Sequence, residues 1–230
     1  MLSVFTPNWF TRFDILIGIF SFLVLLTFFI VSIKNYKLTK NKKLMYLGMG
    51  FLLVSLAELA DIFTKFVLYH KITVFQNVGL VTLKYEVLRF FDLPYDLGFF
   101  MYKFLTLLGL YIIYRLPLKN KNWGDAVLAV LFIILASLAG QIIYYIFHII
   151  TFVILALIIN NYFKVYKKNQ NQNTKLLLSS FIIIAIAHAI FILSKLPSLY
   201  VLGEIIELLG YIGFLSLIIR INKNEWSKRK

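Results

Sequence analysis

Seven long apolar segments constrain the fold of this chain more than any other feature. A helix needs about 20 apolar residues to cross the hydrocarbon core of a bilayer. The segments that meet this requirement cover about 12–33, 44–68, 94–115, 124–140, 142–163, 175–195 and 199–220. Hydrophobic residues make up 61% of the chain and charged residues 15%, whereas a soluble domain is about half apolar and a quarter charged. The sequence therefore predicts an all-α integral membrane protein, a seven-transmembrane-helix bundle in a single polytopic domain over residues 1–230.

The basic residues predict how this bundle is oriented. Most of the 24 Lys and Arg residues fall in four segments, 34–43, 115–121, 164–175 and 220–230. Short segments rich in Lys and Arg stay on the cytoplasmic side of a membrane. We therefore expect a multi-pass protein of the cytoplasmic membrane with its N-terminus outside and its C-terminus in the cytoplasm. Its richness in Lys, Ile, Asn and Phe is typical of an AT-rich prokaryotic genome.

The external segment 71–92 has no span of its own. Its apolar residues alternate with charged ones in a way that predicts a short amphipathic helix lying at the interface, although its Val, Thr and Tyr residues also permit a hairpin. The sequence shows no internal repeat, which speaks against an inverted-repeat transporter fold.

Composition also excludes several function classes. The chain has no Cys, which rules out disulfides, thiolate nucleophiles and Cys-ligated zinc. Its net charge of +14 lies mostly in loops beside the spans, where basic residues meet anionic lipid, so the expected partner is the lipid bilayer and not nucleic acid. No Ser lies in a nucleophile motif, and we expect a protein that is not an enzyme.

Ionisable residues inside the predicted spans give the strongest functional signal. Such residues are costly in a bilayer and usually face the bundle interior or a water-filled cavity. On the second span Glu58, Asp61 and Lys65 share one helical stripe. Each of the other polar spans also presents a single stripe, and nearly all these residues fall at the outer depth, above inner halves that are apolar. We predict an outward-facing polar pocket lined by Glu58, Asp61, Lys65, Asp96, Lys103, Tyr145, His148, His188, Lys195, Glu204 and Glu207.

Two readings of this polar pocket remain open. Carboxylates and imidazoles are metal ligands, so a divalent metal is one possible cofactor. The candidate ligands are Glu58, Asp61, His148, His188, Glu204 and Glu207. Alternatively, the acids serve only to neutralise the buried lysines, because buried charges are normally paired.

Seven spans with the N-terminus outside and an outward-facing pocket resemble the general plan of rhodopsins and heptahelical receptors. The resemblance is one of topology only and does not establish function. A retinal protein needs a Schiff-base lysine in the middle of span seven, and residues 199–219 contain no Lys. Retinal is therefore excluded as a cofactor.

The leading hypothesis is a receptor-like binding or sensing module that takes a dipolar ligand and signals through a cytoplasmic or membrane partner protein. One alternative is a small proton- or cation-coupled transporter or channel subunit, although the apolar inner half opposes transport. Others are a membrane-embedded metal-dependent lipid hydrolase and a purely structural subunit.

Overall fold

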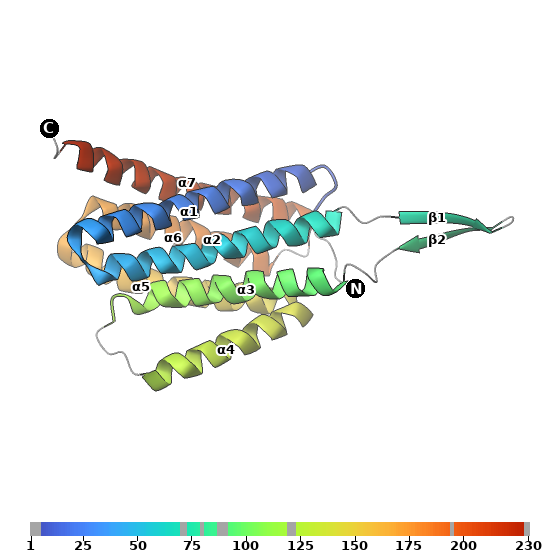
Figure 1. Ribbon diagram of the computed structural model, residues 1–230, viewed down its shortest axis with the longest axis horizontal. Coiled ribbons are helices and arrows are strands. Elements are labelled where there is room, and N and C mark those ends of the chain that lie inside the picture. The colour runs from blue at the N-terminus through green and yellow to red at the C-terminus, as the bar shows by residue number, and fades with distance from the viewer. Residues whose placement is uncertain are drawn as a thin grey trace.

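The computed structural model of the protein contains seven long helices and one two-stranded hairpin, and it describes residues 6–69, 73–78, 81–86, 92–118, 123–193 and 196–227 (Figure 1). The elements, in chain order, are α1 (Thr11–Thr39), α2 (Lys42–Tyr69), β1 (Thr73–Val78), β2 (Val81–Glu86), α3 (Asp92–Arg115), α4 (Trp123–Ile142), α5 (Tyr144–Asn169), α6 (Gln172–Ile192) and α7 (Pro197–Ser227). All seven helices are long and apolar enough to span a membrane.

The helices begin close to the predicted positions, but several end later. α1 continues to Thr39, α5 to Asn169 and α7 to Ser227, well past the predicted ends of those spans. The extra turns carry Lys, Asn and Tyr, so a criterion based on apolar residues stops before them. These helices therefore extend beyond the apolar segment at the end of the bundle that is rich in basic residues.

The segment between α2 and α3 forms a hairpin and not the predicted amphipathic helix. β1 and β2 pair antiparallel, with Thr73 opposite Glu86 and Val78 opposite Val81. Both strands are rich in β-branched and aromatic residues, such as Val74, Phe75 and Tyr85, which favour a strand over a helix. The helix prediction was wrong, and the hairpin that the same residues permitted is the observed structure. We call the end of the bundle beside β1 and β2 the hairpin end.

Consecutive helices are neighbours, and the last helix closes against the first. α1 packs on α2, α2 on α3, α5 on α6 and α6 on α7, while α1 also packs on α7 and α3 on α5. Among the described residues α4 contacts only α3 and α5. It lies at the margin of the bundle in Figure 1, with most of its surface outside the helix packing.

Close contacts between α2 and α3 depend on glycine. A Cβ atom on Gly109 would lie 2.7 Å from the Gly50 carbonyl oxygen and 3.1 Å from the Val54 backbone nitrogen. Backbone atoms cannot move aside as a flexible side chain can, so both helices are held at a distance that only a residue without Cβ allows. Small residues perform this role widely in membrane bundles.

Four phenylalanines with their rings in mutual contact fill the bundle on the side away from the hairpin. Phe28, Phe51, Phe181 and Phe214 are at most 4% exposed. The ring centroids of Phe28 and Phe51 lie 4.0 Å apart, those of Phe51 and Phe214 5.1 Å, and those of Phe181 and Phe214 5.2 Å. We call these four residues the aromatic plug, and the plug and the apolar residues around it give this half its dry core.

Candidate functional site: a charged cavity at the hairpin end

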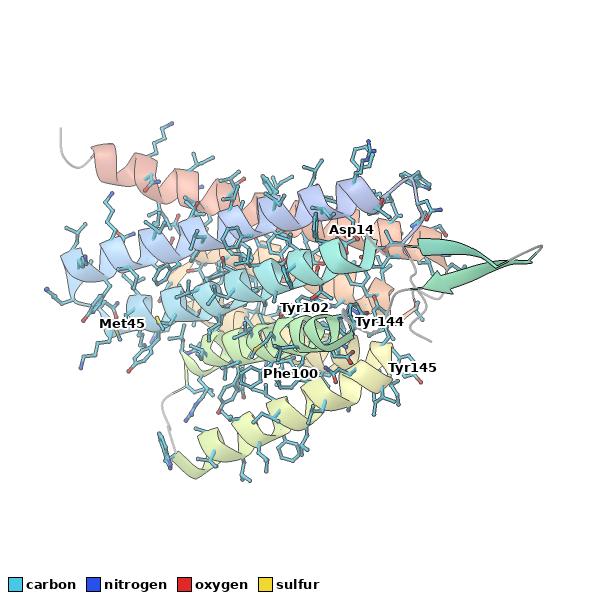
Figure 2. The ribbon with its side chains drawn as sticks, turned by 45° about the vertical axis from the view of Figure 1, so that its right-hand side comes forward. Asp14, Met45, Phe100, Tyr102, Tyr144 and Tyr145 are labelled. Atoms are coloured by element: carbon cyan, nitrogen blue, oxygen red, sulfur yellow. The ribbon has the colours of Figure 1, made fainter. Side chains whose placement is uncertain are left out.

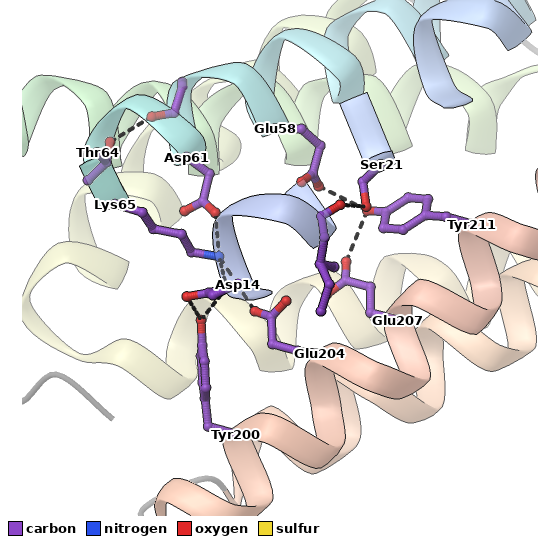
Figure 3. Close-up of polar contacts among 12 residues, drawn as sticks. Asp14, Ser21, Glu58, Asp61, Thr64, Lys65, Tyr200, Glu204, Glu207 and Tyr211 are labelled. Carbon is purple, nitrogen blue, oxygen red and sulfur yellow. Dashed lines mark hydrogen bonds and ion pairs between the residues drawn. The ribbon is translucent and has the colours of Figure 1, made fainter. Parts of the chain in front are cut away.

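Lys65 is the centre of a cluster of buried carboxylates. Its Nζ lies 2.7 Å from Asp14 Oδ1, 2.8 Å from Asp61 Oδ2 and 3.6 Å from Glu204 Oε1 (Figure 3). Asp61 is one helical turn before Lys65 on α2, whereas the other two partners come from α1 and α7. One ammonium group therefore ties three helices together.

Asp14 is a member of this cluster that the sequence analysis missed. Its side chain is fully buried, and the Tyr200 hydroxyl lies 3.3 and 3.2 Å from its two carboxylate oxygens. A signal for it was present, because Asp14, Gly18 and Ser21 are spaced four and three residues apart and form the buried face of α1. The same stripe criterion that selected Glu58 and Asp61 would have found it.

Tyr211 joins a second pair of carboxyl groups. Its hydroxyl oxygen lies 2.9 Å from Glu58 Oε1 and 3.0 Å from Glu207 Oε1 (Figure 3). A hydroxyl has one hydrogen and can donate to only one carboxylate at a time. A proton on one carboxyl group, or a cation bound by both carboxylates, would stabilise the second contact.

Lys103 is the other lysine of the site, and its surroundings are different. It is 1% exposed, its Nζ donates to the Gly140 carbonyl at 2.5 Å, and it lies 3.5 Å from the ring centroid of Phe99. Gly140 is in the last turn of α4, where carbonyl groups have no partner within the helix. Within the described part of the chain, no carboxylate comes within 4.0 Å of this ammonium group.

Both lysines line one cavity of about 120 Å³. Its walls come from Thr6, which precedes α1, and from α1, α2, α3, α5, α6 and α7, and they include Glu58, Asp61, Glu204 and Glu207. A smaller void of about 30 Å³ continues from Glu58, Glu207 and Tyr211 to the aromatic plug. The charged space is therefore bounded on one side by an apolar barrier.

Two buried histidines face each other beside the cavity. His148 Nδ1 and His188 Nδ1 are 2.9 Å apart, so one of these nitrogens carries a hydrogen and the other accepts it. His148 lines the cavity, and His188 borders the smaller void. In the described residues no group of three or more acids and histidines lies close enough to hold a metal ion. The structure thus gives the predicted metal site, and the hydrolase that depends on it, no support.

Most predicted pocket residues lie where the stripes placed them. Seven of them line the cavity: Glu58, Asp61, Lys65, Lys103, His148, Glu204 and Glu207. Asp96 is exposed and contributes its backbone carbonyl to a hydrogen bond from Gln141. Lys195 lies outside the described residues.

The prediction for Tyr145 is wrong because the helix is interrupted just before it. Ile143 has extended backbone (φ −126°, ψ 100°), so α5 begins at Tyr144. The predicted stripe ran through Gln141, Tyr145 and His148 as if they were on one helix, but Gln141 belongs to α4. Tyr144 lines the cavity, whereas Tyr145 is 46% exposed at the edge of the molecule (Figure 2).

Comparison of the chain with protein-family models, with curated proteins and with solved structures found no match.

Proposed function

We propose that this protein is a multi-pass membrane protein that binds a small molecule carrying both an ammonium and a carboxylate group. The observation that carries the proposal is Lys103. A buried charge is normally paired, yet among the described residues this ammonium group contacts a carbonyl oxygen and aromatic rings and has no carboxylate within 4.0 Å. A ligand carboxylate would supply the missing anionic partner.

The ammonium end of the ligand is assigned to the carboxylates at Tyr211. Glu58 and Glu207 present two oxygens to one hydroxyl hydrogen, and a bound ammonium would donate to both. Acids outnumber lysines in the cavity lining, so a ligand with only negative charge would be repelled. Lys103 lies where α3 meets the end of α4, whereas Glu58 and Glu207 lie on α2 and α7, which separates the two recognition points.

The membrane and the orientation belong to the same proposal. Basic residues border the apolar segments at the plug end of the bundle, and this distribution favours a cytoplasmic membrane with the plug end facing the cytoplasm. The cavity then opens toward the outside of a prokaryotic cell. Binding is proposed in place of catalysis, because within the described residues the two histidines bond to each other and the acids pair with Lys65 or Tyr211.

Calorimetry with matched small molecules tests the proposal. The probes are ω-amino acids from glycine to 5-aminopentanoate, each with the amine and the carboxylate of the same chain length. We expect the best amino acid to bind more tightly than either matched half-molecule. A hydrogen bond to a charged group contributes about 1.5–3 kcal/mol, which corresponds to about tenfold or more in affinity.

Two variants assign the ends of the probe. Lys103→Met should weaken binding of the amino acid and leave binding of the matched amine unchanged. Glu207→Gln should weaken binding of the matched amine and leave binding of the matched carboxylate unchanged. Tyr145→Phe is the control, because this exposed tyrosine lies outside the cavity. Equal affinity of the wild-type protein for an amino acid and its matched amine would contradict the role of Lys103, and no binding by any probe would contradict the site.

A further inference from the structure

Two turns in distant parts of the chain have the same construction. α1 is followed by Lys40 and α5 by Gln170, both with left-handed backbone (φ 56° and 46°). The next residue is Asn41 in the first case and Asn171 in the second. Each Asn side-chain oxygen accepts a hydrogen bond from the backbone N–H two residues later, at 3.0 and 2.9 Å. The α1–α2 and α5–α6 pairs therefore share a connection of the same length and geometry.

The helices that follow these turns are buried in the same pattern. With Asn41 set on Asn171, every buried position of α2 from Gly48 to Asp61 falls on a buried position of α6 from Leu178 to Phe191. The same alignment applies to the preceding helices. It places Gly18, Ser21, Leu25 and Phe28 of α1 on His148, Thr151, Leu155 and Ile158 of α5, all of them buried.

α3 and α7 extend this equivalence to a third helix. Gly50 on α2 is in close contact with Gly109 on α3, and the position matching Gly50 on α6, Ser180, is in close contact with Gly213 on α7. Setting Gly109 on Gly213 aligns four further buried pairs. These are Thr106 with Gly210, Leu107 with Tyr211, Leu110 with Phe214, and Ile113 with Leu217.

The helix contacts have the symmetry that this alignment requires. We call α1–α3 the first unit and α5–α7 the second unit. The units meet where α1 packs on α7 and where α3 packs on α5, and exchanging the units converts one contact into the other. Because α4 is a single helix between them, matched helices run in the same direction. Two parallel units that exchange in this way are related by an approximate twofold axis along the bundle.

Both the cavity and the plug lie between these units. The described cavity lining comes from both units and from Thr6, with no contribution from α4. Phe51 and Phe181 occupy matched positions, one in each unit, with ring centroids 6.3 Å apart. Lys103 is likewise matched by Glu207, so equivalent positions carry opposite charges in the cavity wall. Transporters built from parallel repeats bind substrate at such an interface and expose it alternately by moving one repeat against the other.

We infer that the chain consists of two structurally equivalent three-helix units and that their relative motion opens the cavity to each membrane face in turn, which makes the protein a transporter of its ligand. The nature of that ligand rests on the proposed function. Separation of Phe51 from Phe181 opens the plug side, while contact between them closes it. The apolar half is then a gate shared by the two units, and not a permanent floor.

Sided labelling tests this inference without knowledge of the ligand. The chain has no Cys, so a Ser21→Cys variant places one thiol in the cavity wall. Membrane vesicles of both orientations are treated with 2-(trimethylammonio)ethyl methanethiosulfonate, a small cation that does not cross lipid. Ser137→Cys is the control, because Ser137 is fully buried on α4 outside the cavity lining. We expect the Ser21→Cys variant to be modified from both faces and the Ser137→Cys variant from neither.

The other outcomes separate the two proposals. Modification of Ser21→Cys from one face only would overturn transport and leave a fixed binding site. Modification from neither face would overturn transport and also the solvent-reachable cavity on which binding depends.

Spin labels at Asn41 and Asn171 give a second measurement that leaves the cavity unchanged. Transport requires two populations of the distance between these two labels, one for each arrangement of the units. A pair at Asn41 and Leu118, which both border the first unit, should give one population. A single population for the Asn41–Asn171 pair would also overturn transport.

Discussion

At the scale of single residues, buried charges hold the hairpin end together. Lys65 contacts carboxylates from α1 and α7 in addition to one on its own helix. Asp14 is fully buried and contacts both Lys65 and Tyr200 at short range. Removing one partner from such a pair is far more costly than replacing both, because it leaves a buried charge without compensation.

Substitution of Lys65 should therefore destabilise the protein strongly. We expect Lys65→Met to lower the free energy of unfolding by about 3–5 kcal/mol, the usual cost of a buried charge left without its partner. The double variant Lys65→Met/Asp14→Asn should recover part of this loss, because the amide needs no counter-charge. Reversible unfolding in mixed micelles measures both effects. A loss below about 1 kcal/mol, as for an exposed ion pair, would show that Lys65 is not a structural centre.

Helical spacing alone could predict many of the site residues. Glu58, Asp61 and Lys65 share a stripe that follows directly from the period of the helix. Asp14 could have been found in the same way. The Tyr145 prediction failed because residue spacing cannot reveal a backbone break at Ile143, and the partner of Lys103 could not be predicted because Gly140 contributes a backbone oxygen.

At the scale of helices and strands, apolar length predicted all seven helices because a bilayer sets their minimum length. It could not predict how far α1, α5 and α7 continue as polar helices. The hairpin was also uncertain from the sequence, since its alternating residues allow either structure. The sequence also does not predict the distance between helices. This distance depends on which glycines contact the backbone of a neighbouring helix and which face open space.

Glycine substitutions test this spacing directly. Gly109→Ala places a methyl group against the backbone of α2, and we expect lower thermal stability in detergent as α2 and α3 are forced apart. The matched position Gly213 faces the Ser180 hydroxyl, so Gly213→Ala should have an effect of the same sign but smaller size.

The control for both is Gly124→Ala. Gly124 lies on α4 with nothing within 4 Å of the added atom, and alanine is favoured over glycine in a helix by about 1 kcal/mol. This variant should be as stable as the wild-type protein or more so. Equal destabilisation by Gly109→Ala and Gly124→Ala would mean that the α2–α3 contact does not set the helix spacing.

At the scale of the whole molecule, the two units explain why the polar site is central and the plug is shared. The equivalence was not visible in the sequence because it lies in burial and turn geometry. Matched positions include Phe51 with Phe181, but also Glu58 with His188 and Asp61 with Phe191. Matched positions are therefore buried alike although they carry different residue types.

The proposed orientation, with the plug end in the cytoplasm, rests on the basic residues at that end of the bundle. Single cysteines at Asn41 and Asn171, which are exposed in the two matched turns, should react with an impermeant maleimide only from the cytoplasmic side. A cysteine at Ser198, exposed at the start of α7, should react only from outside. Labelling of intact and opened cells measures this. The reverse pattern would invert the bundle and place the plug outside.

Native mass spectrometry of protein gently extracted from its own membrane tests the central claim most directly. The account predicts one small organic adduct per chain in the wild-type protein and in Tyr145→Phe, and its loss in Lys103→Met. An adduct that persists in Lys103→Met, or a bare chain in all three proteins, would contradict the claim that the charged cavity binds a dipolar molecule.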